Sequence, residues 1–359
     1  MPPQPRQRLS PEVFDLPVAK MRAGWYTDAY FNHARATLLA DGRHPNVVVQ
    51  VFQKNDAWLG GMDEAIAILR LCSEEPHALT IRALYDGDRL EPWETVLTIE
   101  GDYTTFAHLE TVFLGTLARR TLITTNVVRV LEAANGKPII FMPARFDHHR
   151  VQAGDGYAAY VAGRITGLEI GVTSDEQASW WGGRGIGTVP HALIAAYGGD
   201  TVLAARKFAE WAPPDMSVTV LVDFENDSVR TALAVAEALG ERLWGVRLDT
   251  SETLVDRSLW EEMGDFKPTG VNERLVRRTR DALDRAGFGH VRIVASGGFT
   301  VEKIREFEGR GVPVDAYGIG SSLIRGANDF TADVVMTDGR PSGKFGRHLR
   351  DNPRLELVD

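Results

Sequence analysis

The sequence predicts an α/β protein in which a βα barrel follows an N-terminal α+β module. Two observations support this fold class. From residue 137 onward short apolar runs alternate with helical segments, and two successive strand-to-helix turns near residue 300 are rich in glycine and serine. The alternation predicts parallel strands joined by right-handed crossovers. Ligands of such a barrel bind at the carboxyl ends of its strands, which is where the glycine turns fall.

Six apolar runs are the expected barrel strands. Each is long enough for a buried parallel strand and too short for a typical helix. Helical segments at about 155–165, 200–211, 228–239 and 272–287 separate them. A closed barrel would include a further strand, which no apolar run identifies. The six expected strands are Ile139–Met142, Glu169–Val172, Val218–Val222, Leu243–Leu248, Val291–Ala295 and Ala316–Gly318.

The first glycine turn is Ser296-Gly297-Gly298, and Thr300 after it suits the N-cap of the next helix. The second turn is Gly318-Ile319-Gly320-Ser321-Ser322. Glycine has no β-carbon, so backbone N–H groups can approach an anion closely, and helix N-termini favour negative charge. We interpret the two turns in tandem as a phosphate cradle. The alternative is that the glycines only form tight turns.

The region before residue 137 mixes short strands and helices. Residues 46–52 read as a strand, 62–72 have helical spacing, and 79–100 read as strands joined by a turn at Asp86-Gly87-Asp88. Residues 103–135 are expected to be helical. The expected domains are a disordered N-terminus at 1–14, a sandwich with a helical linker at 15–136, the barrel at 137–325, and a C-terminal segment at 326–359 that returns to the sandwich.

Composition argues against several classes of protein. A net charge of −9 at pH 7 disfavours a general nucleic-acid binder. Cys72 is the single cysteine, so neither an intrachain disulfide nor a cysteine zinc site can form. No apolar run approaches the about 18 residues that a membrane helix needs, and the first residues lack an apolar signal core. We expect a soluble, cytoplasmic protein without nucleic-acid or membrane partners.

Charged residues stand at the ends of several expected strands. Arg247 and Asp249 lie two residues apart on one strand, so their side chains point to the same side. The arginine suits a phosphate or a carboxylate, and the aspartate suits ribose hydroxyls or Mg²⁺. Asp223 ends the preceding strand and is a second candidate metal ligand. The alternative for this group is a structural ion pair at the barrel rim.

Two further segments carry candidate site residues. Arg145 follows the first barrel strand and could clamp a carboxylate, whereas the adjacent His148 and His149 cannot share a helix face, which disfavours paired metal ligation. His191 follows a glycine-rich loop and could be a general base, a phosphate partner or a phosphorylated nucleophile. A solvated helix start and a structural histidine are the alternatives. The residues alone predict an enzyme that acts on a phosphorylated sugar or nucleotide with Mg²⁺.

Short motifs spread over most of the chain resemble nicotinate phosphoribosyltransferases, particularly the shorter archaeal-type members. No single motif is specific, and the resemblance depends on their order and spacing. The motifs are Tyr26-Thr27-Asp28-Ala29-Tyr30-Phe31, Gly101-Asp102-Tyr103, Leu109-Glu110-Thr111, Leu114-Gly115, Gly187 to Leu193, Leu221-Val222-Asp223, Gly245 to Thr250, Ser296 to Phe299, Asp315 to Leu323, Gly339-Arg340-Pro341 and Lys344 to Arg347.

This resemblance implies the type II phosphoribosyltransferase fold, in which an irregular βα barrel accompanies an N-terminal α+β open-sandwich domain completed by C-terminal strands. It implies transfer of phosphoribose from 5-phosphoribosyl-1-pyrophosphate (PRPP) to nicotinate, which gives nicotinate mononucleotide and pyrophosphate in NAD biosynthesis. It also implies Mg²⁺, a homodimer or larger homo-oligomer with shared active sites, and ATP as a co-substrate in those members that couple its hydrolysis to transfer. Whether this chain uses ATP stays open at this point.

The resemblance also assigns roles to individual residues. His191 matches the histidine that ATP phosphorylates, and Arg247 and Asp249 would hold PRPP, with Asp249 on the ribose hydroxyls. Tyr30 would reach into the neighbouring subunit and stack on the pyridine ring, while Arg145 would meet the nicotinate carboxylate. The implied set is catalytic His191, Asp249 and Arg247; nicotinate-binding Tyr30, Arg145, Ser174 and Thr188; phosphate-binding Arg247, Asp249, Ser296, Gly297, Gly298, Gly318, Gly320 and Ser321; and metal-binding Asp223 and Asp249.

Two segments beside the expected base pocket depart from the family's pattern. The family usually has Phe-Gly-x-Arg-Arg or Phe-Gly-x-Arg-His where this chain reads Met142-Pro143-Ala144-Arg145-Phe146, and residues 175–185, with Trp180-Trp181, are unusual. Ser174 stands where nicotinamide-using relatives have an aspartate, which would repel a carboxylate, so Ser174 favours nicotinate. Asp175 is adjacent, and a shift of one residue in the alignment would reverse this argument.

Three alternative functions stay open on the sequence. One is a quinolinate-type transferase of the same fold, for which His148, His149 and Arg150 would supply extra basic groups. Another is a non-catalytic protein that binds PRPP or a nucleotide, although His191 and Asp249 are both present. The last is an unrelated βα-barrel isomerase or aldolase with a phosphate site.

Overall fold

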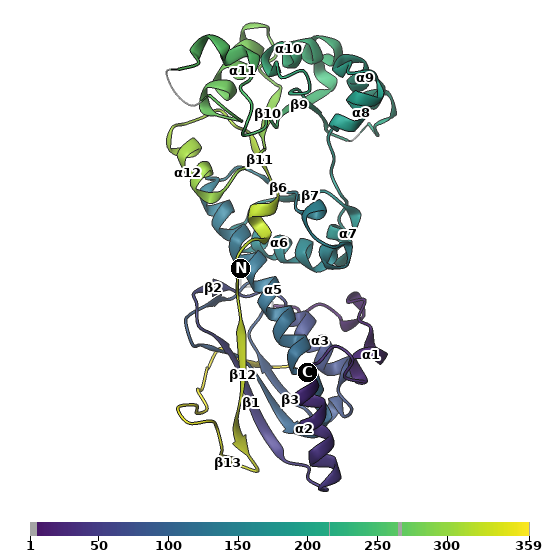
Figure 1. Cartoon of the computed structure of the whole chain (residues 1–359), viewed down its shortest axis with the longest axis vertical. Helices are drawn as coiled ribbons and strands as arrows, with labels where there is room; N and C mark the ends of the chain where they lie inside the picture. Colours follow the sequence, from purple (N-terminus) through teal and green to yellow (C-terminus); the bar gives the residue numbers. More distant parts are fainter. Residues whose placement is uncertain (1–5, 215, 265–267, 359) are drawn as a thin grey trace. The chain divides into compact units, whose positions relative to one another are not determined.

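The computed structural model describes residues 6–214, 216–264 and 268–358. The chain forms two compact units (Figure 1). Three of the four boundaries between them fall inside helices α5 (Glu110–Ala133) and α6 (Gln152–Thr166), and the fourth, between Arg325 and Gly326, falls in a loop. The sandwich unit comprises Met1–Asn126, Tyr157–Ile165 and Gly326–Asp359, and the barrel unit comprises Val127–Gly156 and Thr166–Arg325.

An antiparallel sheet of six strands, in the order β13-β12-β1-β5-β3-β14, forms the sandwich unit. A second sheet pairs β2 with β4, so the two strands that flank the Asp86-Gly87-Asp88 turn belong to different sheets. The strands are β1 (Asn46–Gln53), β2 (Ala57–Trp58), β3 (Thr80–Ala83), β4 (Arg89–Leu90), β5 (Thr95–Asp102), β12 (Phe330–Thr337), β13 (Arg340–Pro341) and β14 (Glu356–Leu357). The helices before α5 are α1 (Val18–Arg22), α2 (Ala29–Ala40), α3 (Met62–Cys72) and α4 (Tyr103–Phe106).

Helix α3 lies in the core of the sandwich unit, because nearly all of its residues are buried. It packs closely on α5 through Gly60 and Gly61. A β-carbon on Gly60 would lie 2.4 Å from Thr124 Oγ1, and one on Gly61 would lie 2.7 Å from Arg120 Cγ. Arg120 also pairs with the buried Glu64 at 2.9 Å, which neutralises a carboxylate on the inward face of α3.

The C-terminal segment joins the sheet of the sandwich unit. Strand β12 pairs with β1 from Val47 opposite Thr337 to Gln53 opposite Phe330 (Figure 1). Strand β1 therefore lies between β12 and β5, at the centre of the sheet. Residues distant in sequence therefore complete this unit.

The expectation of a disordered N-terminus at 1–14 is wrong for residues 6–14, and residues 1–5 lie outside the described part. Arg8 donates from Nη1 to Asp63 Oδ1 at 2.9 Å and from Nη2 to the carbonyls of Ala83 and Leu84. Its guanidinium also lies 3.9 Å from the ring centroid of Tyr85. These contacts hold a proline-rich segment that has little helical or strand periodicity of its own.

Asp86 gives the sandwich unit a predicted pH dependence. Its carboxylate accepts from the N–H of Met62 at 2.7 Å, and burial, with the neighbouring Asp63, raises its pKa to about 8. An unfolded aspartate titrates near about 3.9, so the folded state binds this proton more tightly. The free energy of unfolding should therefore fall as the pH rises from about 4 to about 8.

The variant Asp86→Asn keeps an oxygen that accepts from Met62 and removes the titration. We expect the free energy of unfolding of this variant to lack this part of the pH dependence. Relative to the native chain, the variant should therefore be more stabilised at pH 8 than at pH 5. Urea denaturation at several pH values measures this. Asp41→Asn, at an exposed position (side chain 71% exposed), is the matched control. Identical pH slopes for Asp86→Asn and the native chain would contradict the prediction.

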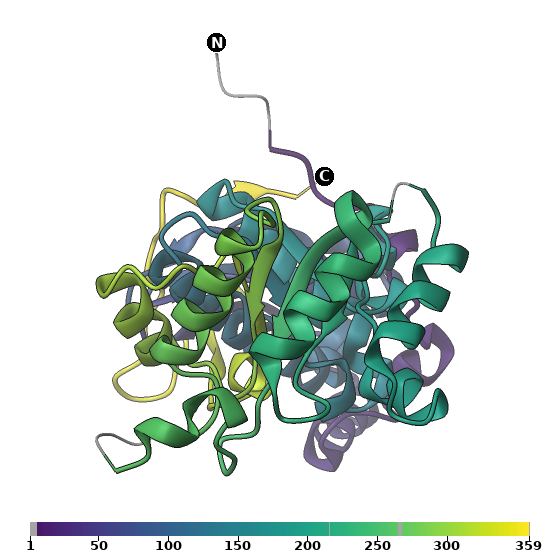
Figure 2. The same ribbon diagram turned by 90° about the horizontal axis from the view of Figure 1, so that it is seen from above.

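A parallel sheet of six strands, in the order β7-β6-β11-β10-β9-β8, forms the barrel unit. All six expected strands are present, with ends shifted by one residue at most. Figure 2 shows helices of this unit (teal to lime) around the strands. The strands are β6 (Ile139–Phe141), β7 (Ile170–Val172), β8 (Val218–Leu221), β9 (Leu243–Leu248), β10 (Arg292–Ala295) and β11 (Ala316–Ile319). The helices are α7 (Asp175–Ala178), α8 (His191–Ala196), α9 (Thr201–Trp211), α10 (Ser228–Leu239), α11 (Glu273–Arg285) and α12 (Val301–Gly309).

An extended segment that the sequence pattern missed contacts both edges of this sheet. Ile186 donates its N–H to the carbonyl of Val172 at the end of β7, at 2.7 Å. Val189 forms a parallel bridge with Val220 of β8 and donates to Thr219 at 2.8 Å. This segment therefore connects the two edges of the curled, half-barrel sheet. The segment is short and interrupted by glycines, so its sequence has no strand periodicity from which it could be predicted.

Residues 157–165, which the sequence places in the barrel, belong to the sandwich unit. The reason is the small buried face of α6, which carries Ala158, Ala159 and Ala162. Thr124 Oγ1 of α5 donates to the carbonyl of Ala158 at 3.2 Å, so the two helices approach closely there. Among the described residues, no helix combines the length and the apolar character needed to span a bilayer.

Candidate active site

A hydrogen-bonded network stands where β9 and β10 end. Arg247, near the end of β9, donates from Nη2 to Asp249 Oδ2 at 3.0 Å and from Nε to Ser296 Oγ at 2.8 Å. Ser296 Oγ in turn lies 2.7 Å from Asp249 Oδ1. The ion pair is mostly buried, with 17% and 19% of the two side chains exposed. Each of the three groups holds the other two in a defined orientation, as a preorganised binding site requires.

Thr188 and His191 adjoin this network from the closing segment and the start of α8. Thr188 Oγ1 accepts from Arg247 Nη1 at 3.4 Å. His191 Nε2 is hydrogen-bonded to Asp223 Oδ1 at 2.9 Å, and this bond raises the pKa of His191, while burial opposes the shift. Asp249 raises the same pKa further, and Arg247 lowers it. His191 therefore lies within the electrostatic field of the Arg247–Asp249 pair.

The two glycine turns lie next to this network and are closely approached by side chains. Gly297 and Gly298 have φ angles of +82° and +68°, which glycine adopts without strain. A β-carbon on Gly298 would lie 1.8 Å from Glu252 Oε1. In the second turn, a β-carbon would lie 2.9 Å from Met142 Sδ at Gly318 and 2.6 Å from Phe146 Cε2 at Gly320. The positive φ angles favour glycine at Gly297 and Gly298, whereas a β-carbon at Gly318 or Gly320 would require Met142 or Phe146 to shift.

Glu252 and Lys303 are charged groups beside the first turn that the sequence analysis missed. Lys303, in the first turn of α12, has its Nζ 3.4 Å from the Gly297 carbonyl and 4.4 Å from the Phe299 ring centroid. Burial lowers the pKa of Lys303, and the Glu252 carboxylate opposes that shift. Helix α12 itself is capped by Thr300, as predicted. Both charges reach the turn from loops and helices, so sequence spacing gave no signal for them.

The residues expected to bind the base are less closely assembled. Ser174 acts as the N-cap of α7: its Oγ accepts from the N–H of Gln177 and donates to Gln152 Oε1 at 2.8 Å. Arg145 is exposed, and its Cζ lies 5.4 Å from the Phe146 ring centroid. Tyr30 is on α2 of the sandwich unit and 61% exposed, with its hydroxyl 3.4 Å from Asp28 Oδ2.

The remaining candidates have these positions. Ser321 begins a short 3-10 helix (Ser321–Ile324) directly after the second glycine turn. The described residues contain no group of three or more His, Cys, Asp or Glu side chains that could hold a metal ion by themselves. The two candidate metal ligands, Asp223 and Asp249, each have a protein partner as described above. The structure thus joins Arg247, Asp249, Ser296, Thr188, Gly297, His191 and Asp223 in one region of the barrel unit.

Comparison with known proteins gives three consistent likenesses. Residues 28–121 match the family model described as quinolinate phosphoribosyl transferase, N-terminal domain. Nicotinate phosphoribosyltransferase pncB1 of Mycobacterium tuberculosis is 32% identical over 268 residues, which is 72% of this chain and 54% of that protein. The chain spans about half the length of the curated relatives it matches.

Solved structures extend the likeness to the whole fold. The nicotinate-nucleotide pyrophosphorylase from Pyrococcus furiosus superposes with a TM-score of 0.80 at 29% identity, covering 96% of this chain and 85% of that one. Human nicotinic acid phosphoribosyltransferase shares the fold with a TM-score of 0.64 at 18% identity, covering 88% of this chain and 76% of that one. The chain belongs to the nicotinate phosphoribosyltransferase family and has the type II phosphoribosyltransferase fold.

Proposed function

We propose that this protein transfers phosphoribose from PRPP to the ring nitrogen of nicotinate, releasing pyrophosphate and forming nicotinate mononucleotide. The observation that carries the proposal is the network of Arg247, Asp249 and Ser296 beside the Gly297-Gly298 turn. It combines a guanidinium for phosphate oxygens, a carboxylate for ribose hydroxyls and a glycine turn at a helix start. The relative from Mycobacterium tuberculosis, a nicotinate phosphoribosyltransferase, supports the same activity.

The chemistry suits this arrangement. The bond between ribose C1 and the pyrophosphate oxygen breaks while the pyridine nitrogen bonds to C1. Positive charge develops on the sugar, and the fixed, negatively charged carboxylate of Asp249 is compatible with that charge. The guanidinium of Arg247 attracts the negative charge that leaves with pyrophosphate. The pyridine nitrogen is already a nucleophile, so no strong base is required. Most of the rate enhancement should then come from positioning the two substrates.

Mg²⁺ would neutralise and orient the leaving pyrophosphate when bound. Asp223 and Asp249 offer the oxygen donors that this ion prefers, and Mg²⁺ commonly takes one or two carboxylates while substrate phosphates and water supply its other ligands. Asp223 is 9% exposed and Asp249 is 19% exposed, so both carboxylates are shielded from bulk solvent. These two residues are the ones we assign to the metal.

Arg145 is the residue that we assign to the nicotinate carboxylate. Among the described residues it has no acidic partner, and the Phe146 ring orients its guanidinium. Ser174 contributes through the absence of a negative charge rather than through its hydroxyl, which is already engaged in capping α7. Quinolinate carries a second carboxylate, and the exposed His148, His149 and Arg150 next to Arg145 make a quinolinate-type reaction the second candidate.

The first test is product formation from PRPP and Mg²⁺ with nicotinate, nicotinamide and quinolinate in parallel, each with and without ATP. Nicotinate mononucleotide formed only from nicotinate is the expected result. Turnover of quinolinate with release of CO₂ would contradict the proposal and support the quinolinate-type reaction instead. Binding of PRPP without turnover of any base would mean a binding protein instead.

Tyr30 provides a test of shared active sites. We propose that it stacks on the pyridine ring in a second copy of the chain, because it is 61% exposed on α2. Tyr30→Ala and Arg247→Gln should each be nearly inactive, whereas subunits of the two variants mixed under exchanging conditions should regain partial activity, since some mixed dimers contain one intact site. A mixture as inactive as its components would contradict sharing.

Glu252 should weaken PRPP binding, because its carboxylate lies against Gly298, where we place the 5-phosphate. The variant Glu252→Gln removes a negative charge from this turn. We expect the KM for PRPP to fall by roughly three- to tenfold, the effect of about 1 kcal/mol of relieved repulsion, with kcat little changed. Glu261→Gln, on the 3-10 helix Arg257–Glu262, is the control. A higher KM in Glu252→Gln would show that the carboxylate assists binding.

A further inference from the structure

Lys303, in the first turn of α12, is a half-buried cation to which the proposed reaction assigns no part. Its Nζ donates to the Gly297 carbonyl at 3.4 Å and lies 4.4 Å from the centroid of the Phe299 ring. No carboxylate forms an ion pair with this ammonium in the part of the chain that the structure describes. Removing a charge from water without an ion-pair partner costs stability, so stability does not account for a lysine at this position.

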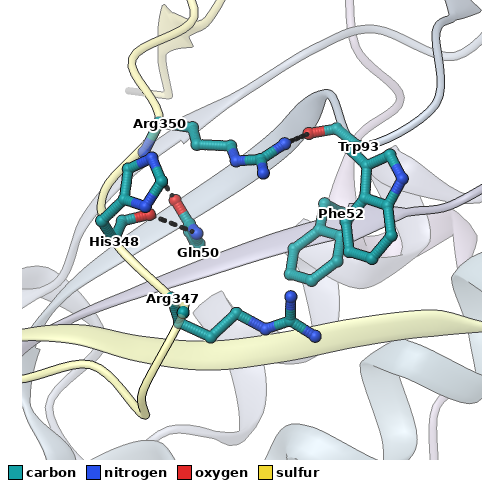
Figure 3. Close-up of a pocket in the computed structure, with 7 residues that line it drawn as sticks. Gln50, Phe52, Trp93, Arg347, His348 and Arg350 are labelled. Atoms are coloured by element: carbon teal, nitrogen blue, oxygen red, sulfur yellow. Dashed lines mark hydrogen bonds between the residues drawn. The ribbon is translucent and has the colours of Figure 1, made fainter.

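The C-terminal segment of the sandwich unit contains, by contrast, a cation that the chain itself satisfies. In Figure 3, Arg347 extends toward the Phe52 ring, and its Cζ lies 5.3 Å from that ring's centroid. Its Nε lies 2.8 Å from Asp333 Oδ2. The adjacent His348 carbonyl accepts from Gln50 Nε2 at 2.9 Å, which fastens the segment to β1. Arg347 therefore has a carboxylate partner within the chain and does not require an external anion.

The backbone beside Lys303 offers hydrogen-bond donors for an anion. Among the described residues, the N–H groups of Gly297, Gly298 and Phe299 have no hydrogen-bond acceptor. These residues directly precede α12, a helix of nine residues that Thr300 caps. Consecutive unpaired N–H groups at a helix N-terminus, together with the positive end of the helix dipole, favour the binding of phosphate oxygens. The donors and the ammonium of Lys303 therefore occupy the same turn.

The chain itself places an anionic oxygen against this turn. Glu252 Oε1 would lie 1.8 Å from a β-carbon on Gly298, so the carboxylate occupies space that only glycine leaves open. Burial lowers the pKa of Lys303, and the Glu252 carboxylate opposes that shift, so the carboxylate and the ammonium lie within each other's electrostatic field. The turn therefore accommodates a negatively charged oxygen in the field of Lys303 when no substrate is bound.

We propose that Lys303 binds the 5-phosphate of the ribose substrate, and that this contact makes the site selective for a 5-phosphorylated pentose. The identity of the sugar rests on the proposed function. On binding, the ammonium exchanges an uncharged acceptor, the Gly297 carbonyl at 3.4 Å, for a phosphate oxygen, which forms a stronger charge-assisted hydrogen bond. The flexible aliphatic stem of lysine permits this movement. The phosphate takes the place of the Glu252 carboxylate against the turn and supplies the counter-charge that Lys303 lacks.

The test is calorimetric titration of the full chain with ribose 5-phosphate, and separately with pyrophosphate, in the absence of any base. Lys303→Met keeps a long apolar side chain and removes the charge. It should raise the Kd for ribose 5-phosphate by about tenfold or more, the effect of one hydrogen bond to a charged group, and leave the Kd for pyrophosphate nearly unchanged. Lys303→Arg, which keeps the charge, should bind ribose 5-phosphate more tightly than Lys303→Met does. Lys207→Met, on α9 where Lys207 pairs with Glu210 at 2.8 Å, is the matched control.

Kinetics give a second readout, because the 5-phosphate is remote from the bond that breaks. Lys303→Met should raise the KM for PRPP with kcat and the KM for nicotinate little changed. Equal losses of affinity for ribose 5-phosphate and pyrophosphate, or a lower Tm with unchanged affinities, would overturn the proposal and give Lys303 a structural role. Unchanged affinity for ribose 5-phosphate in Lys303→Met, while the native chain makes nicotinate mononucleotide, would overturn it and leave the proposed function standing. Weaker binding of ribose 5-phosphate in Lys303→Met, when the native chain turns over no base, would support it while the proposed function fails.

Discussion

Replacing Arg247 by glutamine is expected to lower kcat/KM for PRPP by about 10²- to 10³-fold, the range found when a group that stabilises developing charge is removed. Arg247 donates to Asp249, Ser296 and Thr188, so the substitution removes a phosphate ligand and also releases the carboxylate from its fixed position. Steady-state kinetics with varied PRPP measures the effect. A loss confined to KM would mean that Arg247 acts only in substrate binding.

Two comparisons make this result interpretable. Arg292→Gln is the matched control, because Arg292 begins β10 at the opposite end of the barrel and pairs with Asp315 at 3.0 Å. It should keep nearly full activity, because ligands of a βα barrel bind at the carboxyl ends of the strands. Thermal melting of both variants excludes unfolding as the cause. Equal activity of Arg247→Gln and Arg292→Gln would refute the assignment of the site.

The parallel strands were predictable because most of their residues are buried, which gives each strand a short apolar run. The segment from Ile186 to Val189 was not, because glycines interrupt it and two single contacts, to Val172 and Val220, define it. The prediction that residues 6–14 are disordered was wrong for a related reason. The order of that segment comes from Arg8 and its partners elsewhere in the chain. Local pattern reports periodic burial, and it does not report contacts between distant loops.

The same distinction applies to the candidate site. Arg247, Asp249 and Ser296 follow strand ends directly, so the alternation of strands and helices was sufficient to predict their meeting. Glu252 and Lys303 reach the glycine turn from less regular positions, and their proximity depends on loop conformation. Gly298 illustrates the limit, because the sequence predicted an open turn there and the structure shows a carboxylate against it.

His191 should govern any stimulation by ATP. Its Nε2 is bonded to Asp223, so Nδ1 is the nitrogen we expect to attack the terminal phosphorus of ATP, with ADP leaving. His191→Ala should therefore abolish ATP stimulation while some transfer without ATP remains. Phosphate transferred from labelled ATP to the native chain, and not to His191→Ala, would establish the intermediate. Full ATP coupling in the variant would exclude the role.

The pH dependence of that stimulation gives an independent check through Asp223. The hydrogen bond to Asp223 is the main reason that the pKa of His191 is raised, so Asp223→Asn should lower this pKa. Attack by Nδ1 needs the neutral ring, and stimulation should therefore rise with pH through the pKa of His191. In Asp223→Asn the midpoint of this rise should move to lower pH, with a reduced maximum because Asp223 is also one of the two residues assigned to Mg²⁺. An unmoved midpoint would mean that another group controls the titration, since no other single contact of His191 contributes as much to its pKa.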